Sequence, residues 1–317
     1  MRTVIFSSTE FGKNCLDGLL RLPEFELAGL ASTGSAIEIS YSSAPVEIRT
    51  HYNFEVDAVR LGVPFYRHPR GFSSEECAVW LKACRPELIL VLGWYYMMPR
   101  ALRSLAPRGA LGIHASLLPR YRGGAPLTWA LINGEAEVGA TLFKLEDGVD
   151  NGEIFGQFAT PVLDDDDIST LYDRVTTGSV RLLCQSIPKI ASGSEVGRKQ
   201  DEAMATCFPQ RSPADGCINW TWSAKRVRDF VRAQTRPYPG AFTTILGSEI
   251  TIWKVGVVES APGAPGQVTR DGDSTIITCG DGAGLLLLDC EWRTTGASPD
   301  WTHLHRAHCD LPEAKHD

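Results

Sequence analysis

Residues 112–152 read GIHASLLPRYRGGAPLTWALINGEAEVGATLFKLEDGVDNG, and this stretch decides the fold of the first half of the chain. It starts inside one apolar run, Ala110–His114, and contains a second, residues 138–145, that ends in a turn rich in Asp, Gly and Asn. Both runs are predicted to be buried strands of one sheet. His114 then lies at the carboxyl end of its strand, where open α/β sheets bind their ligands.

Short apolar runs alternate with helical patterns on the N-terminal side of this stretch, and one more run follows it. Further strands are expected at residues 3–7, 27–32, 88–92 and 154–158. Two buried helical faces are predicted between the first of them, formed by Phe11, Cys15, Leu19 and Leu20 and by Val79, Trp80 and Ala83. Alternating strands and helices predict an α/β fold with a Rossmann-like, mostly parallel sheet.

A smaller second domain is expected toward the C-terminus. Residues 191–206 lack an apolar period and are interpreted as a linker, so the chain is divided into domains 1–205 and 206–317. The second domain contains an amphipathic helix, residues 224–232, and strand-like runs at residues 241–246, 250–258, 275–279 and 285–290. This pattern predicts a β-rich, partly open barrel of the OB type.

Four consecutive aspartates, residues 164–167, precede a helical pattern through Leu171, Val175, Leu182 and Ile187. Acidic side chains stabilise a helix N-terminus, so helix capping is preferred to metal binding. His303, His305 and His308 beside Cys309 match no zinc spacing. We therefore expect no metal site.

The composition narrows the function classes. The 317 residues carry a formal net charge of -7, and no Lys/Arg-rich block is present, so nucleic acid is an unlikely main partner. No apolar run approaches the roughly 18 residues of a membrane span, and the N-terminal one is shorter than the core of a signal peptide. Nine scattered cysteines suit reduced thiols. These features predict a cytoplasmic enzyme.

The residues that could do chemistry lie at the predicted strand ends. The turn after the first strand, SSTEFG, has no GxGxxG, which disfavours dinucleotide binding. His114 lies at the end of one predicted strand and Asp150 in a Gly-flanked loop at the end of another. If both lie at one edge of the sheet, the imidazole and the carboxylate can act as an acid/base pair. A single histidine at a strand end also fits a purely structural role.

The run HASLLPRYRGGAP, followed by the Asp150 of DGVDNG, resembles the folate-dependent formyltransferases. QRSPADGCINW and RPYPGAF resemble the start of the C-terminal domain shared by methionyl-tRNA formyltransferase and the formyltransferase half of the bifunctional aminoarabinose enzyme. The resemblance thus covers nearly the whole chain. It implies transfer of a formyl group from 10-formyltetrahydrofolate to a primary amine, with His114 as the catalytic imidazole and Asp150 as its carboxylate partner.

The resemblance also implies two sets of binding residues. The pterin would lie against the backbone of two segments: Gly93, Trp94, Tyr95, Tyr96, Met97 and Met98, and Lys144, Leu145, Glu146, Asp147 and Gly148. The acceptor would contact the loop after His114: Ser116, Leu117, Arg120, Arg122 and Gly123. The aromatic segment also fits simple core packing.

One position departs from the family. The family usually has Asn two residues before the His, where this chain has Gly112. That Asn donates a hydrogen bond to the developing oxyanion, a contact worth roughly 3 to 4 kcal/mol in other enzymes. Three interpretations are open: a water, Asn133 or Tyr96 replaces the donor; the widened site admits another acceptor; or the enzyme is impaired or only hydrolyses the folate.

The acceptor is interpreted as a small amine, most plausibly a nucleotide-linked amino sugar. A tRNA substrate requires a basic loop, whereas residues 33–56 contain Glu38, Glu47 and Glu55 against Arg49 alone. Arg120 and Arg122 would meet a diphosphate, and Tyr41, Tyr52 or Trp129 a sugar or base. Methionyl-tRNA, a hydroxyornithine-type amino acid and folate hydrolysis are the alternatives. A homodimer and the role of the second domain are left open.

Overall fold

The computed structural model describes residues 1–317 except 39–41, 43, 69–73, 273, 294–308 and 310–317. It forms two compact units. The first comprises residues 1–124, 137–161 and 173–208, and the second comprises residues 125–136, 162–172 and 209–317. The interpreted linker, residues 191–206, therefore belongs to the first unit. Two segments of the predicted first domain, residues 125–136 and 162–172, belong to the second unit.

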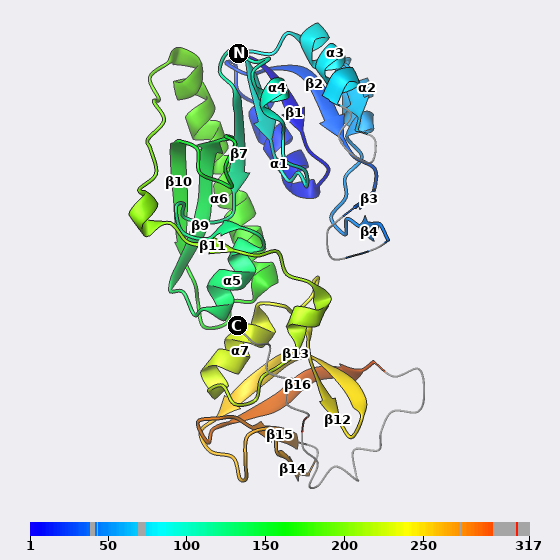
Figure 1. The fold of residues 1–317 in the computed structure, drawn as a ribbon, viewed down its shortest axis with the longest axis vertical. Helices are drawn as coiled ribbons and strands as arrows, with labels where there is room; N and C mark the ends of the chain where they lie inside the picture. Colours follow the sequence, from blue (N-terminus) through cyan, green and yellow to red (C-terminus); the bar gives the residue numbers. More distant parts are fainter. Residues whose placement is uncertain (39–41, 43, 69–73, 273, 294–308, 310–317) are drawn as a thin grey trace. The chain divides into compact units, whose positions relative to one another are not determined.

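The first unit is built on a central sheet whose strand order is β10-β9-β7-β6-β1-β2-β5 (Figure 1). The strands are β1 Arg2–Phe6, β2 Glu26–Ser32, β5 Phe65–Arg67, β6 Leu88–Val91, β7 Ala110–His114, β9 Glu137–Lys144 and β10 Ile154–Pro161. From β5 to β7 the strands run parallel, while β9 pairs antiparallel with β7 and β10 antiparallel with β9. The predicted Rossmann-like, mostly parallel sheet is confirmed.

Helices cover both faces of this sheet because its side chains alternate between two cores. The helices are α1 Glu10–Leu19, α2 Phe54–Leu61, α3 Ser74–Cys84, α4 Arg100–Arg103 and the part of α6 Ile168–Ser192 that lies in this unit. In β1, Ile5 packs with residues of α1, α2 and α6, whereas Val4 and Phe6 pack with residues of α3 and α4. Smaller strands are β3 Ala36–Ile37 and β4 Val46–Glu47, which pair with each other.

Part of the expected helix burial is wrong. Val79 is 70% exposed and Ala83 is also exposed, and the buried stripe of α3 runs through Cys77, Leu81 and Cys84. Cysteine is among the most buried residue types, and two cysteines at helical spacing mark the true core face. Leu20 caps the end of α1 and is 37% exposed.

The second unit holds helix α5 Pro126–Ile132, helix α7 Ala224–Arg232 and an antiparallel sheet of order β12-β13-β16-β15-β14. The strands are β12 Ala241–Ile245, β13 Ser248–Val258, β14 Val268–Asp271, β15 Ser274–Thr278 and β16 Gly284–Trp292, preceded by a 3-10 turn, η2 Pro213–Gly216. Helix α7 matches its predicted range, and β14 was not predicted. The expectation of a strand-rich C-terminal domain is confirmed.

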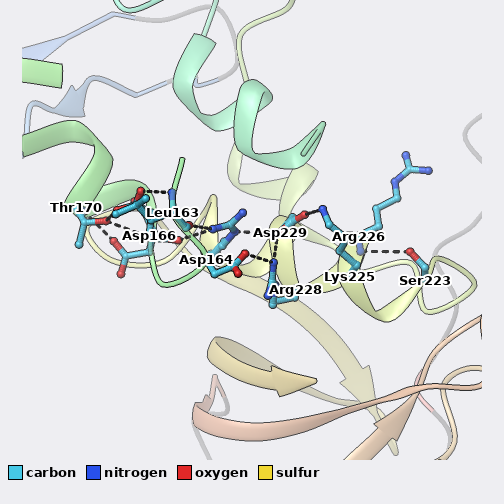
Figure 2. Close-up of polar contacts among 11 residues, drawn as sticks. Leu163, Asp164, Asp166, Thr170, Ser223, Lys225, Arg226, Arg228 and Asp229 are labelled. Atoms are coloured by element: carbon cyan, nitrogen blue, oxygen red, sulfur yellow. Dashed lines mark hydrogen bonds and ion pairs between the residues drawn. The ribbon is translucent and has the colours of Figure 1, made fainter. Parts of the chain in front are cut away.

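The acidic run before α6 caps the helix, as expected. Asp167 Oδ1 accepts a hydrogen bond from the Thr170 amide at 3.0 Å, and Asp166 Oδ2 accepts one from the Leu163 amide at 2.7 Å (Figure 2). Across the described ranges, no group of three or more His, Cys, Asp or Glu side chains could hold a metal ion. His303, His305 and His308 lie outside these ranges.

All nine cysteines are free thiols, and most of them are buried. Burial raises the pKa of the Cys77 and Cys279 thiols to about 12. In the part of the chain that the structure describes, none of the helices combines the length and apolar character that a membrane crossing requires.

Candidate active site

The candidate site is centred on His114 and Asp150, which the first unit brings together. His114 is the last residue of β7, and Asp150 lies in the loop between β9 and β10. His114 Nδ1 lies 3.6 Å from Asp150 Oδ2, with side-chain exposures of 11% and 21%. The pair is therefore largely shielded from water but still reachable from the carboxyl edge of the sheet.

Hydrogen bonds fix the orientation of the imidazole. His114 Nε2 lies 2.7 Å from the Tyr121 carbonyl oxygen. A carbonyl only accepts, so Nε2 carries a proton in this arrangement, and Nδ1 is the nitrogen that faces Asp150. The ring of Phe143 packs edge-on against the imidazole, with centroids 6.4 Å apart. Nδ1 and the carboxylate thus form the polar side of the pair.

The Asp150 carboxylate is held by a backbone amide beside the imidazole. Asp150 Oδ2 accepts a hydrogen bond from the Gly123 amide at 2.8 Å. The Asp150 backbone has a φ of 48°, a left-handed conformation that is unfavourable for a residue other than glycine. Such a conformation persists only where its surroundings hold it, and the contacts of Asp150 meet that condition.

Only glycine fits at position 123. Its φ is 93°, and a Cβ there would lie 2.4 Å from the Phe208 carbonyl oxygen. Gly123 belongs to β8 Arg122–Gly123, which pairs with β11 Cys207–Phe208 of the same unit. The amide that holds Asp150 is therefore placed by a segment far along the chain.

Sequence reasoning missed a second contact to the Asp150 loop, made by Gln200, which lies in the interpreted linker of residues 191–206. Gln200 Nε2 donates to the carbonyl oxygens of Asp150 and Gly152, at 2.7 and 2.8 Å. Gln200 Oε1 in turn accepts from two nitrogens of Arg122, at 3.1 and 2.8 Å. The segment around Gln200 has no apolar periodicity, and its hydrogen-bond partners are distant in sequence, so no local pattern indicates these contacts.

Arg122 was expected to bind acceptor phosphate, but the structure gives it other partners. Its side chain is buried, and it donates to both carboxylate oxygens of Glu202, at 2.9 and 2.7 Å, as well as to Gln200. The Arg122 guanidinium holds the pKa of Glu202 below its usual value. These contacts show that the Arg122 guanidinium supports the loop after His114, and its contact with a phosphate stays a prediction.

The other residues expected at the acceptor side divide into two kinds. The Ser116 hydroxyl is buried and donates to the Arg120 carbonyl at 2.7 Å, and the Leu117 carbonyl accepts from the Arg120 amide at 3.1 Å, so both shape the turn. Arg120 is exposed, with its guanidinium 5.6 Å from the centroid of the Tyr121 ring. Arg120 is the cationic side chain that this loop presents to solvent.

The aromatic segment after β6 is partly core and partly surface. Trp94 packs edge-on against Phe6, with centroids 5.5 Å apart, and Met98 is buried in the same core. Tyr95 is 47% exposed and Met97 is 65% exposed. Gly93 turns the chain with a φ of 60°, and Tyr96 stacks on His68 with centroids 5.5 Å apart.

An acidic side chain ties this segment to the loop that carries Asp150. Asp147 accepts hydrogen bonds from Arg100 and Arg103 of α4, and these contacts hold the pKa of Asp147 below its usual value. Lys144 Nζ pairs with Glu146 at 3.1 Å. Gly148 lies against Asn151, whose side chain would meet a Cβ there at 2.3 Å. The two predicted pterin segments are therefore neighbours.

Gly112 faces apolar side chains. A Cβ at this position would lie 3.1 Å from Leu145 Cδ2, 3.3 Å from the Val91 carbonyl oxygen and 3.6 Å from Phe143 Cε1. Tyr96, one suggested replacement donor, is stacked on His68, and Asn133, the other, caps the end of α5 in the second unit. Replacement of the donor stays a prediction.

The aromatic residues suggested for a sugar or base have varied surroundings. The Tyr52 ring packs edge-on against Phe54 and lies 5.5 Å from Lys13 Nζ. Trp129, in the second unit, lies under the Arg211 guanidinium at 4.8 Å and donates to the Pro209 carbonyl. Tyr41 lies outside the described residues.

A His–Asp pair thus lies at the carboxyl edge of a Rossmann-like sheet, and a strand-rich domain follows in the sequence. Comparison with known proteins shows the family of enzymes to which this chain belongs. The family model described as "Formyl transferase" matches residues 40–187, and "Formyl transferase, C-terminal domain" matches residues 211–294.

The sequence is also similar to curated enzymes over most of its length. It is 31% identical over 287 residues to a methionyl-tRNA formyltransferase of Citrifermentans bemidjiense, covering 90% of this chain and 87% of that protein. It is 35% identical over 231 residues to the enzyme of the same name from Caldanaerobacter subterraneus subsp. tengcongensis, covering 73% and 74%. The chain belongs to the formyl transferase family and is a formyl-transferring enzyme.

Solved structures share the fold at lower identity. A sugar 3N-formyl transferase solved with dTDP and 5-N-formyl-THF aligns with a TM-score of 0.66 at 17% identity, covering 93% of this chain and 99% of that one. HypX from Aquifex aeolicus, solved with tetrahydrofolic acid, aligns with a TM-score of 0.61 at 20% identity, covering 93% of this chain and 44% of that one. These likenesses show the fold alone.

Proposed function

We propose that the protein is an N-formyltransferase that moves the formyl group of 10-formyltetrahydrofolate to the primary amine of a small molecule, a nucleotide-linked amino sugar being the favoured acceptor. The observation that carries formyl transfer is the His114–Asp150 pair at the strand ends, with the Asp150 carboxylate fixed by the Gly123 amide. The family membership given above supports the reaction class.

The pair supplies the proton transfers that the reaction needs. Attack by an amine requires that protons leave the incoming nitrogen and reach the departing one. Asp150 is the more exposed partner, and the Gly123 amide and the imidazole both contact its Oδ2 atom. The acceptor amine would therefore approach the carboxylate side of the pair, while the Tyr121 carbonyl keeps the imidazole in one orientation.

The residues beside the pair fit a folate. 10-Formyltetrahydrofolate carries its formyl group on N10, the nitrogen that links the methylene on the pterin to the aminobenzoyl group. The pterin itself requires an apolar wall and backbone polar groups. Two exposed side chains after β6, Tyr95 and Met97, offer apolar surface, as does Val149, which is 51% exposed next to Asp150. The contacts of Asp147 with Arg100 and Arg103 hold these two segments together.

The charge pattern favours a small acceptor. The region of residues 33–56 contains more carboxylates than cations, and Glu55 pairs with Arg67 of β5. A tRNA backbone would meet unfavourable charge there. Arg120, exposed on the loop that follows His114, supports recognition of an anionic group such as a diphosphate.

The test is acceptor-dependent release of tetrahydrofolate, followed by absorbance. The co-substrate is supplied with no amine, with a panel of nucleotide-linked amino sugars, with hydroxyornithine and with charged methionyl-tRNA, and His114→Ala serves as the control. We expect release with an amino sugar and loss of release in the variant. Equal release with and without an amine would overturn the proposal in favour of folate hydrolysis.

Methionyl-tRNA is the second candidate acceptor, because the curated relatives named above are methionyl-tRNA formyltransferases and match up to 90% of this chain. A tRNA-directed enzyme would lose activity steeply as salt rises, since phosphate contacts release counterions. A weak salt dependence together with turnover of an amino sugar would exclude this candidate.

A further inference from the structure

The segment between α6 and the second unit forms a continuous strap over the loops of the active site. We define the strap as residues 198–208. The backbone amide and carbonyl of Arg198 form hydrogen bonds with the carbonyl and amide of Ile154. The Thr206 amide donates a hydrogen bond to the Pro119 carbonyl. The Arg122 and Gly124 amides donate to the Thr206 and Phe208 carbonyls, both at 2.9 Å. The strap therefore binds the loop after His114 and the strand after Asp150.

One side chain of the strap reaches the backbone of the Asp150 loop itself. Gln200 donates to the Asp150 and Gly152 carbonyls, and its oxygen is held by Arg122. Gly152 is closely packed there, since a Cβ would lie 1.8 Å from the Lys144 carbonyl oxygen. Gln200 is thus fixed at both ends of its amide, by an arginine on one loop and by carbonyls on the other.

Resting on the function proposed above, we propose that Gln200 and Arg122 are positioning residues for formyl transfer, which lock Asp150 in the conformation where its carboxylate meets the Gly123 amide and His114. Left-handed backbone at a non-glycine residue is unfavourable and persists only where its surroundings hold it, so an unheld Asp150 would relax. The two carbonyl contacts of Gln200 bracket this residue. The contacts of Arg122 with both carboxylate oxygens of Glu202 then hold its guanidinium in place against Gln200.

The kinetic test uses variants of matched shape. Gln200→Met keeps the length of the side chain and removes its polar atoms. Arg198→Met is the control, because Arg198 belongs to the same strap but its side chain donates to Gln157, at 3.0 Å. We expect Gln200→Met to lower kcat about 10- to 100-fold with KM for both substrates within about threefold, since misplacement of a catalytic group acts on the chemical step. Arg198→Met should stay within about threefold in both parameters.

A second variant tests the fork. Arg122→Lys keeps the positive charge but cannot hold Gln200 and Glu202 together, because a lysine lacks the rigid fork of a guanidinium. We expect a loss of kcat smaller than that of Gln200→Met, in the same direction. A Gln200→Met enzyme with kcat within threefold of the unchanged protein would overturn the proposal.

Hydrogen exchange at single backbone amides tests the positioning of Asp150 independently of catalytic activity. In Gln200→Met, the Gly123 amide should lose protection about tenfold or more, because its acceptor is the Asp150 carboxylate. The Arg122 and Gly124 amides should keep theirs, since their acceptors are backbone carbonyls of the strap. Unchanged protection at Gly123, or equal loss at all three amides, would contradict a specific action of Gln200 on Asp150.

Tetrahydrofolate release tests the proposed function, and hydrogen exchange at Gly123 tests the positioning role of Gln200, so the two claims can fail independently. If the unchanged protein releases no tetrahydrofolate with any acceptor, the proposed function fails, and exchange at Gly123 still decides whether Gln200 positions Asp150. If release occurs but Gly123 keeps its protection in Gln200→Met, the positioning role fails and the proposed function stands.

Discussion

Two shielded carboxylates, Asp150 in the first unit and Asp229 in the second, have opposite surroundings. Asp150 faces one imidazole and one backbone amide, and 21% of its side chain is exposed. Asp229 is 2% exposed on α7 and contacts three cations: Lys225 at 2.8 Å, Arg232 at 2.9 Å and Arg228 at 3.3 Å (Figure 2).

The cluster around Asp229 joins α7 to the turn before α6. Arg232 donates to the Leu163 and Asp166 carbonyls, at 3.0 and 2.8 Å, and Arg228 lies 4.0 Å from Asp164. Every cation near Asp229 thus also contacts solvent or another part of the unit. These contacts link α7 to the turn before α6, so we interpret the role of Asp229 as structural.

The difference shows how burial and partners separate a reactive carboxylate from a structural one. Asp150 is partly exposed and has a single ionisable neighbour, so a substrate can reach its carboxylate, whereas three cations surround the buried carboxylate of Asp229. Substitutions at these two aspartates and at the residues around the site test whether their surroundings determine their roles.

The largest effect is expected from Asp150→Asn. The amide side chain keeps the size of the carboxylate but removes the proton acceptor, so kcat should fall by about 10² to 10⁴. The thermal midpoint should stay within a few degrees of the unchanged protein. Steady-state kinetics and a melting curve on one preparation measure both, and an active Asp150→Asn enzyme would remove Asp150 from the chemistry.

Asp229→Asn should show the reverse. Three cations would lose their carboxylate, which should lower the free energy of unfolding by about 2 to 3 kcal/mol, below the full cost of an isolated buried charge because Lys225 is 69% exposed. Urea unfolding measures the loss, and kcat per folded molecule should stay within about twofold. A large loss of kcat with full stability would place Asp229 in the reaction.

Gly112→Asn restores the residue usual in the family and should fold. The new side chain must displace Leu145, at a cost of about 1 to 2 kcal/mol. Gly112→Ala, which adds the Cβ alone, separates this packing cost from the effect of the amide. If another donor already serves the oxyanion, kcat should change by less than about threefold, and a large rise in transfer rate would contradict replacement.

The smallest effect is expected at Asp147. The Arg100 and Arg103 guanidinium groups lower its pKa in the folded protein. Their stabilisation is therefore present above the pKa of the unfolded carboxyl group, about 3.8, and is lost as the pH falls through the lower, folded value. The difference in thermal midpoint between the unchanged protein and Asp147→Asn should shrink below about pH 4. A difference independent of pH would contradict the pairing.

Much of the fold follows from local pattern. The run that ends at His114 and the helix of residues 224–232 were predicted with the bounds that the structure shows, because each has a clear apolar period. The stripe of α3 was misplaced because Val79 is apolar but exposed, while two buried cysteines carry weak hydropathy signals.

The site was less predictable than the fold. His114 and Asp150 stand at strand ends within a recognisable motif, so their approach could be expected from topology. Gln200 could not be found in this way, since its hydrogen-bond partners are about 50 residues earlier and its segment has no period. Arg122 was read as a phosphate ligand because sequence does not show that Glu202, 80 residues later, occupies its guanidinium.

The fate of a labelled formyl carbon tests the central claim most directly. Co-substrate labelled in the formyl group is incubated with the enzyme, the amino-sugar panel and charged methionyl-tRNA, and the label is located in amino sugar, formate or tRNA. We predict label in a small amine, at a rate that His114→Ala abolishes. Label in formate regardless of the amine, or in methionyl-tRNA alone, would contradict the account.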